Sequence, residues 1–366
     1  MQSEKKLIVI LGPTAVGKTA LAIEVAKALG TEIISADSRQ FFREMNIGTA
    51  KPSAEELKQV KHHFINSLSV TDDYNVGMFE RDALQVLEKI LAPPHPSPLG
   101  REKVIQVLPQ WGRSACPNRS IGGGGKGFRR GQRIQEGVAV MVGGSGLYIN
   151  AVLNGFDPVP QADKELRANL TALYKEYGIE ELQQQLKRLD PEHYRKVDIK
   201  NPHRLIRAIE VCLITGKPYS EFRKKDSSPN GGGRADDSIS PDRSVREGAL
   251  FTPIKIGLEL GREELYARIN ARVDKMMSDG LVEEVKKLKA HRHRNSLHTV
   301  GYKEVFDFFE GKQDLSRTVE LIKQNTRNYA KRQMTWFRKD KEIKWFSPHD
   351  SKAVIEFVKK ELESKK

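Results

Sequence analysis

Apolar residues along the chain form patterns that predict a parallel sheet. Near-continuous apolar runs occupy residues 7–11 and 138–142, and shorter strand signals occupy 33–37 and 62–65. A continuous run is typical of a strand that is buried on both faces of a parallel sheet. Residues 254–260 alternate apolar and polar positions, which predicts a further strand. The chain therefore belongs to the α/β class.

Helical spacing accounts for most of the remaining chain. Apolar residues recur every three or four positions in five stretches, which are residues 21–29, 79–91, 163–214, 262–289 and 316–339. The third stretch contains Asp-Pro and Asn-Pro breaks but no strand signal. It therefore predicts an all-helical subdomain that is inserted after the sheet strands.

Two stretches, residues 92–137 and 224–250, lack periodicity and are rich in proline or glycine. We interpret both as flexible insertions that cannot bury enough apolar surface to fold. The chain is therefore predicted to consist of seven segments. They are the first part of the core at 1–91, an insertion at 92–137, a core strand with a glycine-rich turn at 138–155, a helical subdomain at 156–215, an insertion at 224–250, the rest of the core with basic helices at 251–346 and a tail at 347–366.

The composition favours a polyanionic partner. The 366 residues carry a net charge of +14. The first insertion has eight basic and two acidic residues, a net +6, so the rest of the chain keeps +8. Nucleic acid is the first candidate for such a partner and a membrane surface the second. The two cysteines, Cys116 and Cys212, are far apart and give no disulfide framework.

Targeting signals are not evident in the sequence. No apolar stretch approaches the roughly 20 residues that a membrane span requires. The N-terminal residues lead into the first strand without a secretion signal. We therefore expect a cytoplasmic protein that does not enter a membrane.

The most informative stretch, residues 12–19, reads GPTAVGKT and lies between a predicted strand and a predicted helix. This is the context of a P-loop, in which backbone N–H groups and the helix N-terminus bind phosphate. Lys18 would add a charge at the phosphates, and the Thr19 hydroxyl could hold Mg²⁺. A chance glycine turn is the alternative. The motif predicts that a di- or triphosphate binds but does not say which.

Asp37 ends the second predicted strand, so we expect it in the crevice at the carboxyl ends of the strands. An Asp-Ser pair before a helix is also an ordinary N-cap, and the sequence leaves cap and catalytic acid open. The glycine-rich turn at 143–146 is a second candidate wall of this crevice. The loop at 48–52 reads as a plain surface turn from its spacing alone.

Basic residues share faces on two predicted helices. Arg204 and Arg207 lie three positions apart, and Lys323, Arg327 and Lys331 lie four apart. The second set is interleaved with aromatic residues, which is compatible with nucleic-acid binding. Solvated charges on a helix remain the alternative for both sets.

Six stretches of the sequence occur in an order that resembles bacterial tRNA dimethylallyltransferases. They are residues 12–19 (GPTAVGKT), 37–40 (DSRQ), 48–52 (GTAKP), 143–148 (GGSGLY), 301–304 (GYKE) and 326–333 (TRNYAKRQ). The resemblance covers nearly the whole chain outside the two insertions. It implies a P-loop NTPase-like parallel-sheet core with an inserted all-helical subdomain and a C-terminal helical region.

The resemblance also implies an activity. Such enzymes move a dimethylallyl group from dimethylallyl diphosphate, with Mg²⁺, to N6 of adenosine 37, which is 3′-adjacent to the anticodon, in tRNAs that read codons beginning with U. They act on the tRNA anticodon stem-loop, and we expect a monomer. Asp37 is the implied general base, and Thr19 and Arg272 are implied to assist the diphosphate.

The implied binding residues fall into two sets. Those for the diphosphate are Gly12, Pro13, Thr14, Ala15, Val16, Gly17, Lys18 and Thr19. Those for tRNA are Asp37, Ser38, Arg39, Gln40, Ser145, Arg167, His203, Arg204, Leu205, Ile206 and Arg207. Ser145 replaces a usual threonine and keeps the hydroxyl, whereas Phe42 replaces a usual tyrosine and loses it.

Three other functions remain open. Transfer to free adenine nucleotides would use the same chemistry, but the helical subdomain and the basic last helix argue against it. An ATP-dependent small-molecule kinase is compatible with the P-loop but leaves the other motifs without a role. A non-catalytic RNA-binding protein would not need an intact P-loop.

Overall fold

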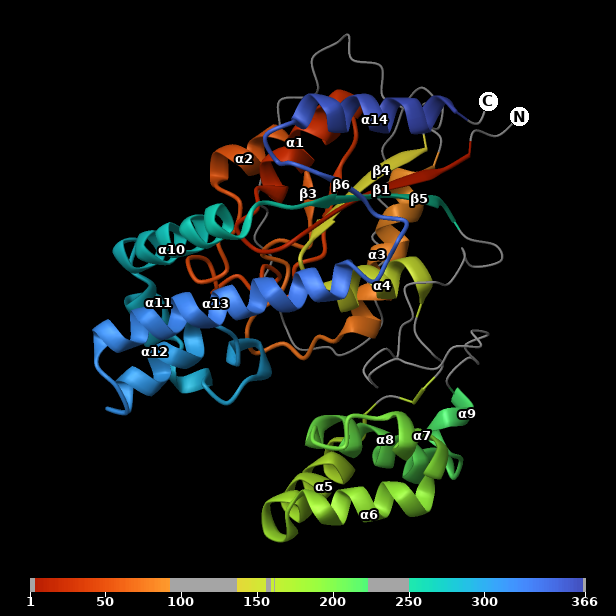
Figure 1. The fold of residues 1–366 in the computed structure, drawn as a ribbon, viewed down its shortest axis with the longest axis vertical. Helices are drawn as coiled ribbons and strands as arrows, with labels where there is room; N and C mark the ends of the chain where they lie inside the picture. The colour runs from red at the N-terminus through yellow and green to blue at the C-terminus, as the bar shows by residue number, and fades with distance from the viewer. Residues whose placement is uncertain (1–3, 93–136, 156–158, 161, 223–249, 365–366) are drawn as a thin grey trace, which may run out of the picture.

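The computed structural model describes residues 4–92, 137–155, 159–160, 162–222 and 250–364. Nearly all of the two predicted insertions, including Cys116, lies outside the described residues. Figure 1 shows an α/β core with a smaller helical unit beside it.

The core is built on one sheet of six strands. Its order is β3-β2-β4-β1-β5-β6, and every neighbouring pair is parallel. The strands are β1 (Lys6–Leu11), β2 (Ile33–Ser35), β3 (His62–His63), β4 (Val138–Gly143), β5 (Thr252–Leu258) and β6 (Lys344–Phe346). β1 therefore lies in the interior of the sheet, between β4 and β5, and the segment that follows it starts at the centre of the carboxyl edge.

Fourteen α-helices are present in the part of the chain that the structure describes. They are α1 (Lys18–Leu29), α2 (Ala54–Gln59), α3 (Val76–Ile90), α4 (Gly146–Asn154), α5 (Lys164–Tyr177), α6 (Ile179–Leu189), α7 (Pro191–Lys196), α8 (Pro202–Thr215), α9 (Tyr219–Phe222), α10 (Arg262–Ser278), α11 (Leu281–Lys287), α12 (Tyr302–Phe309), α13 (Leu315–Phe337) and α14 (Ser351–Glu363). None of the described helices is long and apolar enough to cross a bilayer.

The sheet is covered on both faces, which explains the continuous apolar run of β1. Leu7, Val9 and Leu11 pack into one apolar cluster with residues of α3, α4, α11, α12 and α13. Ile8 and Ile10 pack into a second cluster with residues of α1, α10 and α14. Successive side chains of a strand point to opposite faces, so a strand between two helical layers needs apolar residues at every position.

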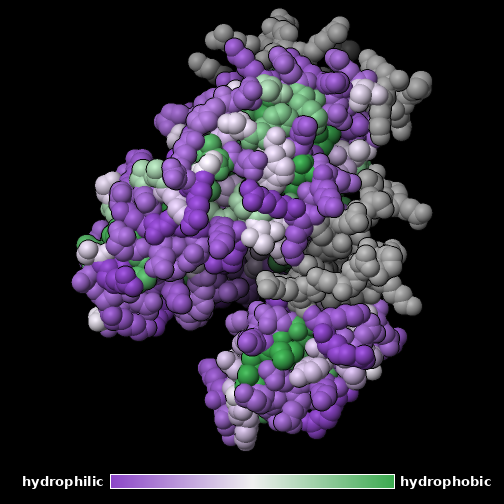
Figure 2. All heavy atoms as spheres, viewed as in Figure 1, coloured by the Kyte–Doolittle hydropathy of each residue, from purple (hydrophilic) through white to green (hydrophobic). Residues whose placement is uncertain are grey.

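The helical unit of α5 to α9 has an apolar core of its own. Leu182, Leu186, Leu205 and Ile209 are 0% exposed within it. Figure 2 shows a mainly hydrophilic outer surface with an apolar patch on this unit. An ion pair of 2.6 Å between Lys164 of α5 and Asp73 connects the unit to the loop before α3.

The structure confirms the predicted parallel α/β fold and adds elements that the sequence analysis did not assign. β6 has only three residues, which is too short for a periodic signal. Within the segment interpreted as a tail, α14 begins after an Asp350 N-cap and buries Val354 and Val358 at 0% and 1% exposure. Its four-residue apolar spacing was a usable signal.

Candidate active site

The loop of residues 12–17 follows β1 and has the backbone shape of an anion-binding site. Ala15 has a φ of 65° and Gly17 a φ of 103°, both left-handed. Alternation of right- and left-handed residues turns successive N–H groups toward a common point. Gly17 is the N-cap of α1 and provides no side-chain cap. The first N–H groups of α1 therefore remain available to an anion.

Lys18 and Thr19 follow in the first turn of α1. The Lys18 ammonium donates a 2.6 Å hydrogen bond to the carbonyl of Pro13, so it lies folded back over the loop. Burial lowers the pKa of Lys18 to about 7, the Asp37 carboxylate opposes this shift, and the Arg272 guanidinium adds to it. The Thr19 hydroxyl forms no hydrogen bond with any described residue.

Asp37 lies at the carboxyl end of β2, as predicted, and begins a turn instead of a helix. Its Oδ1 accepts a 3.0 Å hydrogen bond from the backbone N–H of Arg39, and its carbonyl accepts one of 3.2 Å from Gln40. The N-cap interpretation of Asp37 is therefore wrong. One carboxylate oxygen stabilises the turn, and Asp37 itself lines the cavity described below.

Ser145, in the glycine-rich turn after β4, contacts the same turn. Its hydroxyl accepts a 3.3 Å hydrogen bond from the backbone N–H of Ser38 and lies 3.4 Å from the Ser38 hydroxyl. Gln40 points elsewhere, because its amide donates to the carbonyls of Thr49 and Ala50, both at 3.3 Å. Ser145 and Gln40 thus position the Asp37 turn from two sides.

Arg272 reaches the P-loop from α10. Its Nη1 donates to the Thr14 hydroxyl at 3.1 Å, and its Nη2 lies 3.5 Å from the carbonyl of Thr49. Burial lowers the pKa of Arg272, and the Asp37 carboxylate opposes that shift. The Asp37 carboxylate favours the charged forms of both Lys18 and Arg272, so two cations and one carboxylate share this region.

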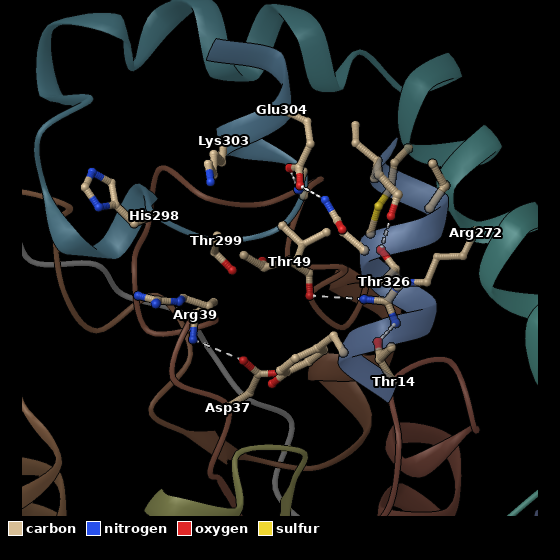
Figure 3. A pocket seen from close by; sticks show the side chains of 18 of the residues that line it. Thr14, Asp37, Arg39, Thr49, Arg272, His298, Thr299, Lys303, Glu304 and Thr326 are labelled. Carbon is tan, nitrogen blue, oxygen red and sulfur yellow. Dashed lines mark hydrogen bonds between the residues drawn. The ribbon is translucent and has the colours of Figure 1, made fainter. Parts of the chain in front are cut away.

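A cavity of about 510 Å³ is lined by Thr14 of the P-loop, by Asp37 and by Arg272. Figure 3 shows Asp37 and Arg39 on one side and Arg272 with Thr14 across from them. Residues that line it come from the strand ends, the 48–52 loop and the helices α10, α12 and α13. The loop at 48–52 is therefore a wall of the site instead of the plain surface turn that its spacing favoured.

Sequence reasoning gave no role to Gln333, although it lies within the 326–333 motif. Its Oε1 accepts a 2.9 Å hydrogen bond from the Thr14 N–H, and its Nε2 donates a 2.8 Å bond to the Gly144 carbonyl. Gln333 is 6% exposed, and a Cβ at position 144 would lie 2.4 Å from its Nε2. Gln333 therefore joins the P-loop to the glycine-rich turn.

Phe42, the residue in place of a tyrosine, does not line this cavity. It is 5% exposed and belongs to the larger apolar cluster, with its ring centroid 6.5 Å from that of Phe41. The hydroxyl that a tyrosine would carry is therefore absent from the apolar core beside the site and not from the cavity itself.

The residues expected at tRNA in the helical unit are not all on its surface. Leu205 and Ile206 are 0% and 5% exposed and belong to the core of the unit. Arg167 and Arg207 both bind Oε2 of the fully buried Glu210, at 2.6 and 2.7 Å.

The other two of these residues lie at the start of α8. His203 is exposed at its first turn. Arg204 lies 3.8 Å from the carboxylate of Asp198.

Two of the three basic residues on α13 face α10 instead of solvent. Lys323 forms a 2.8 Å ion pair with Asp274. Arg327 donates a 2.7 Å hydrogen bond to Asn270. Lys331 alone among the three is exposed. The shared face that the spacing predicted exists, but tertiary contacts occupy most of it.

Comparisons with known proteins agree on one family. A sequence model described as "IPP transferase" matches residues 40–97 and 131–340. The tRNA dimethylallyltransferase of Christiangramia forsetii is 44% identical over 357 residues, which cover 97% of this chain and 98% of that protein. The tRNA dimethylallyltransferase 1 of Bacteroides fragilis is 39% identical over 354 residues, with 97% of each chain covered.

Solved structures agree with this. The full-length tRNA isopentenylpyrophosphate transferase from Bacillus halodurans is 31% identical, with a TM-score of 0.61, and the match covers 99% of this chain and 98% of that one. A eukaryotic dimethylallyltransferase acting on tRNA has a TM-score of 0.69 at 22% identity, with 99% and 80% covered, which supports the fold alone.

A P-loop at the centre of a parallel sheet, open to a cavity with a carboxylate and an arginine, defines a P-loop enzyme that acts on a phosphorylated substrate. The chain belongs to the IPP transferase family, whose relatives compared above are tRNA prenyl transferases.

Proposed function

We propose that this chain transfers a dimethylallyl group from dimethylallyl diphosphate to N6 of adenosine 37 in tRNAs that read codons beginning with U. The observation that carries the proposal is the single cavity that Asp37, Thr14 and Arg272 all line. The family relationship makes the kinase and the transfer to free nucleotides less favoured, because the curated relatives are named for tRNA.

The reaction needs a base and a stabilised leaving group. The N6 amine attacks C1 of the dimethylallyl group, the C1–O bond breaks, and the diphosphate leaves with the electron pair. The Asp37 carboxylate takes the N6 proton as the new bond forms. The P-loop N–H groups, Lys18 and Arg272 stabilise the charge that develops on the diphosphate.

Mg²⁺ fits the donors of the P-loop. The Thr19 hydroxyl has no partner among the described residues, which also contain no cluster of three or more His, Cys, Asp or Glu side chains that could hold a metal. Mg²⁺ commonly takes few protein ligands and completes its octahedron with phosphate oxygens and water. Thr19 would hold the ion, which when bound supplies further charge neutralisation to the diphosphate.

tRNA would extend from the cavity to the helical unit. The proposed contacts in that unit are His203, Arg204, Arg167 and Arg207. The target adenine must leave its base stack to reach the cavity, and the proposed contacts beside it are Arg39 and Ser38. Leu205 and Ile206 support the 203–207 segment from the core. We propose that the enzyme acts in the cytoplasm. We also propose that it acts as a monomer, because one chain provides every group named for the reaction. Sedimentation velocity of the protein with and without tRNA tests whether it is a monomer.

The activity is tested with purified protein, dimethylallyl diphosphate, Mg²⁺ and an unmodified tRNA transcript. We expect a prenylated adenosine in the nuclease digest by mass spectrometry, and none from a transcript with guanosine at position 37. AMP as acceptor and ATP as phosphoryl donor test the alternatives. Prenylation of AMP without prenylation of tRNA would overturn the proposal.

A further inference from the structure

The loop of residues 46–48 is held by one carboxylate. Glu284 on α11 accepts hydrogen bonds from the backbone N–H groups of Asn46 at 2.9 Å, Ile47 at 2.8 Å and Gly48 at 3.1 Å. It also accepts one of 2.6 Å from the Tyr302 hydroxyl. Hydrogen bonds to an ionised acceptor are roughly twice as strong as neutral ones. Four donors on one carboxylate therefore fix this loop firmly to α11.

Tyr302 holds the loop from a second side. Its side chain is 0% exposed, and a Cβ added at Gly48 would lie 2.5 Å from its ring. Burial and the Glu284 carboxylate raise the pKa of Tyr302, so its hydroxyl stays protonated and donates. Only glycine lets the loop approach the ring this closely.

The same loop continues into the active site. Gly48 and Thr49 line the cavity. The Thr49 carbonyl accepts from Gln40 at 3.3 Å and faces Arg272 Nη2 at 3.5 Å. Gln40 belongs to the turn that Asp37 begins. The Thr49 carbonyl thus connects the turn of the proposed base to the arginine at the P-loop.

The loop also contains backbone strain. Ala50 has a φ of 43°, a left-handed conformation that is unfavourable for a residue with a Cβ. Such a conformation persists only where surrounding contacts enforce it. If Glu284 loses its hydrogen bonds, the loop gains freedom to move away from this conformation and take the Thr49 carbonyl with it.

We propose that Glu284 is a positioning residue for the transfer reaction: through the 46–50 loop it fixes the Thr49 carbonyl and thereby the separation of Asp37 and Arg272. The proposal rests on the proposed function, because those two residues serve the acceptor nitrogen and the leaving diphosphate. Glu284 itself does not line the cavity. Alignment of two reactants is sensitive to position, and a misplacement of about 1 Å can lower a rate by about 10²-fold.

The test compares substitutions on one turn of α11. Glu284→Gln keeps the size of the side chain, but its amide group must face two of the four donors, because each oxygen of Glu284 accepts two. Glu284→Asp keeps the charge and shortens the side chain, and serves as a second variant if the first does not fold. Glu283→Gln is the matched control, since Glu283 is exposed and has only a 4.0 Å contact with Lys286.

The measurements are the single-turnover rate at saturating substrates and the dissociation constant for tRNA. For both Glu284 variants we expect the rate to fall by about tenfold or more and the tRNA dissociation constant to change by less than about twofold. Glu283→Gln should match wild type. Tyr302→Phe, which removes one donor and keeps three, should lower the rate by less than either Glu284 variant does, because the three backbone N–H groups still hold the loop to Glu284.

Two outcomes would overturn the inference. In one, both folded Glu284 variants transfer at the wild-type rate. In the other, the rate falls only in proportion to weakened tRNA binding or to loss of folded protein, which would indicate a merely structural role. Failure of the proposed function is distinguishable, because the wild-type enzyme would then produce no prenylated tRNA.

Discussion

The two sides of the candidate active site are built by different means. The sheet side consists of segments 12–19, 37–40 and 143–146, which follow β1, β2 and β4. It offers backbone N–H groups and short side chains whose geometry is set within each segment. The helical side consists of Arg272 and Tyr329, which line the cavity from α10 and α13, and of Gln333 on α13, whose side chain joins the P-loop to the glycine-rich turn.

The two sides therefore differ in how far their geometry depends on the rest of the fold. A short motif can create a phosphate site wherever a strand leads into a helix. Thr14 and Gln333, by contrast, are 319 residues apart in sequence and meet only when the whole core has formed. We expect a change at Asp37 on the sheet side to remove a chemical step, and a change at Gln333 on the helical side to misplace groups that remain present.

The largest expected effect is on the sheet side, at Asp37. Asp37→Asn keeps an oxygen for the Arg39 N–H and so retains the turn. It removes the base, and we expect the turnover rate at saturating substrates to fall by about 10²-fold or more.

The Asp37→Asn variant also tests whether the binding of dimethylallyl diphosphate is retained. The Asp37 carboxylate holds up the pKa of Lys18, so its loss leaves less Lys18 protonated near pH 7. Binding is therefore compared well below pH 7, where Lys18 stays charged and KM for dimethylallyl diphosphate should not increase. A turnover rate close to wild type would exclude Asp37 as the base.

The next effect tests the connection between the two sides. Gln333→Met leaves the Thr14 N–H and the Gly144 carbonyl without their buried partner. We expect a loss of about 1–3 kcal/mol in the free energy of unfolding, from urea denaturation, and about a tenfold lower transfer rate. Gln324→Met on the exposed face of α13 is the control. Equal stability of the two variants would show that Gln333 does not fix the P-loop.

The same contrast explains what could be predicted from the sequence. The P-loop, the position of Asp37 and five strands follow from local motifs and apolar periodicity. The partners of Lys323 and Arg327 could not be predicted, because spacing shows that charges share a face but not what packs against it. Glu284 carries no local signal, since its three backbone partners lie more than 230 residues earlier in the chain.

A third effect concerns the charge state of Lys18. With a pKa lowered to about 7, Lys18 in the free enzyme loses its proton as the pH rises above 7, whereas bound diphosphate favours the protonated form. Diphosphate binding should therefore take up a proton above pH 7, and affinity should fall by up to about tenfold per pH unit.

Calorimetry at pH 8 in buffers of different ionisation enthalpy measures this proton uptake. Lys18→Arg is the comparison, because a guanidinium stays protonated throughout this range. The diphosphate titrates equally in both proteins, so their difference isolates Lys18. Equal uptake by both would show that Lys18 stays charged in the free enzyme.

The smallest effect distinguishes residues within the helical side itself. Lys331 is exposed, whereas the Lys323 side chain is 16% exposed and its ammonium lies 2.8 Å from Asp274. A lysine that neutralises an RNA phosphate releases a counterion, and its loss should flatten the log–log salt dependence of tRNA binding by about 0.7–0.9.

We therefore expect Lys331→Ala to flatten the slope and Lys323→Ala to leave it unchanged, from dissociation constants measured over a range of KCl concentrations. The substitutions are alike in charge and lie two turns apart on α13, so they differ mainly in the partner of the ammonium group. An ion pair that is already formed releases no counterion when tRNA binds, since its charge is neutralised beforehand. A flatter slope for Lys323→Ala would mean that the pair with Asp274 opens in the complex and that α13 presents its whole basic face to the RNA.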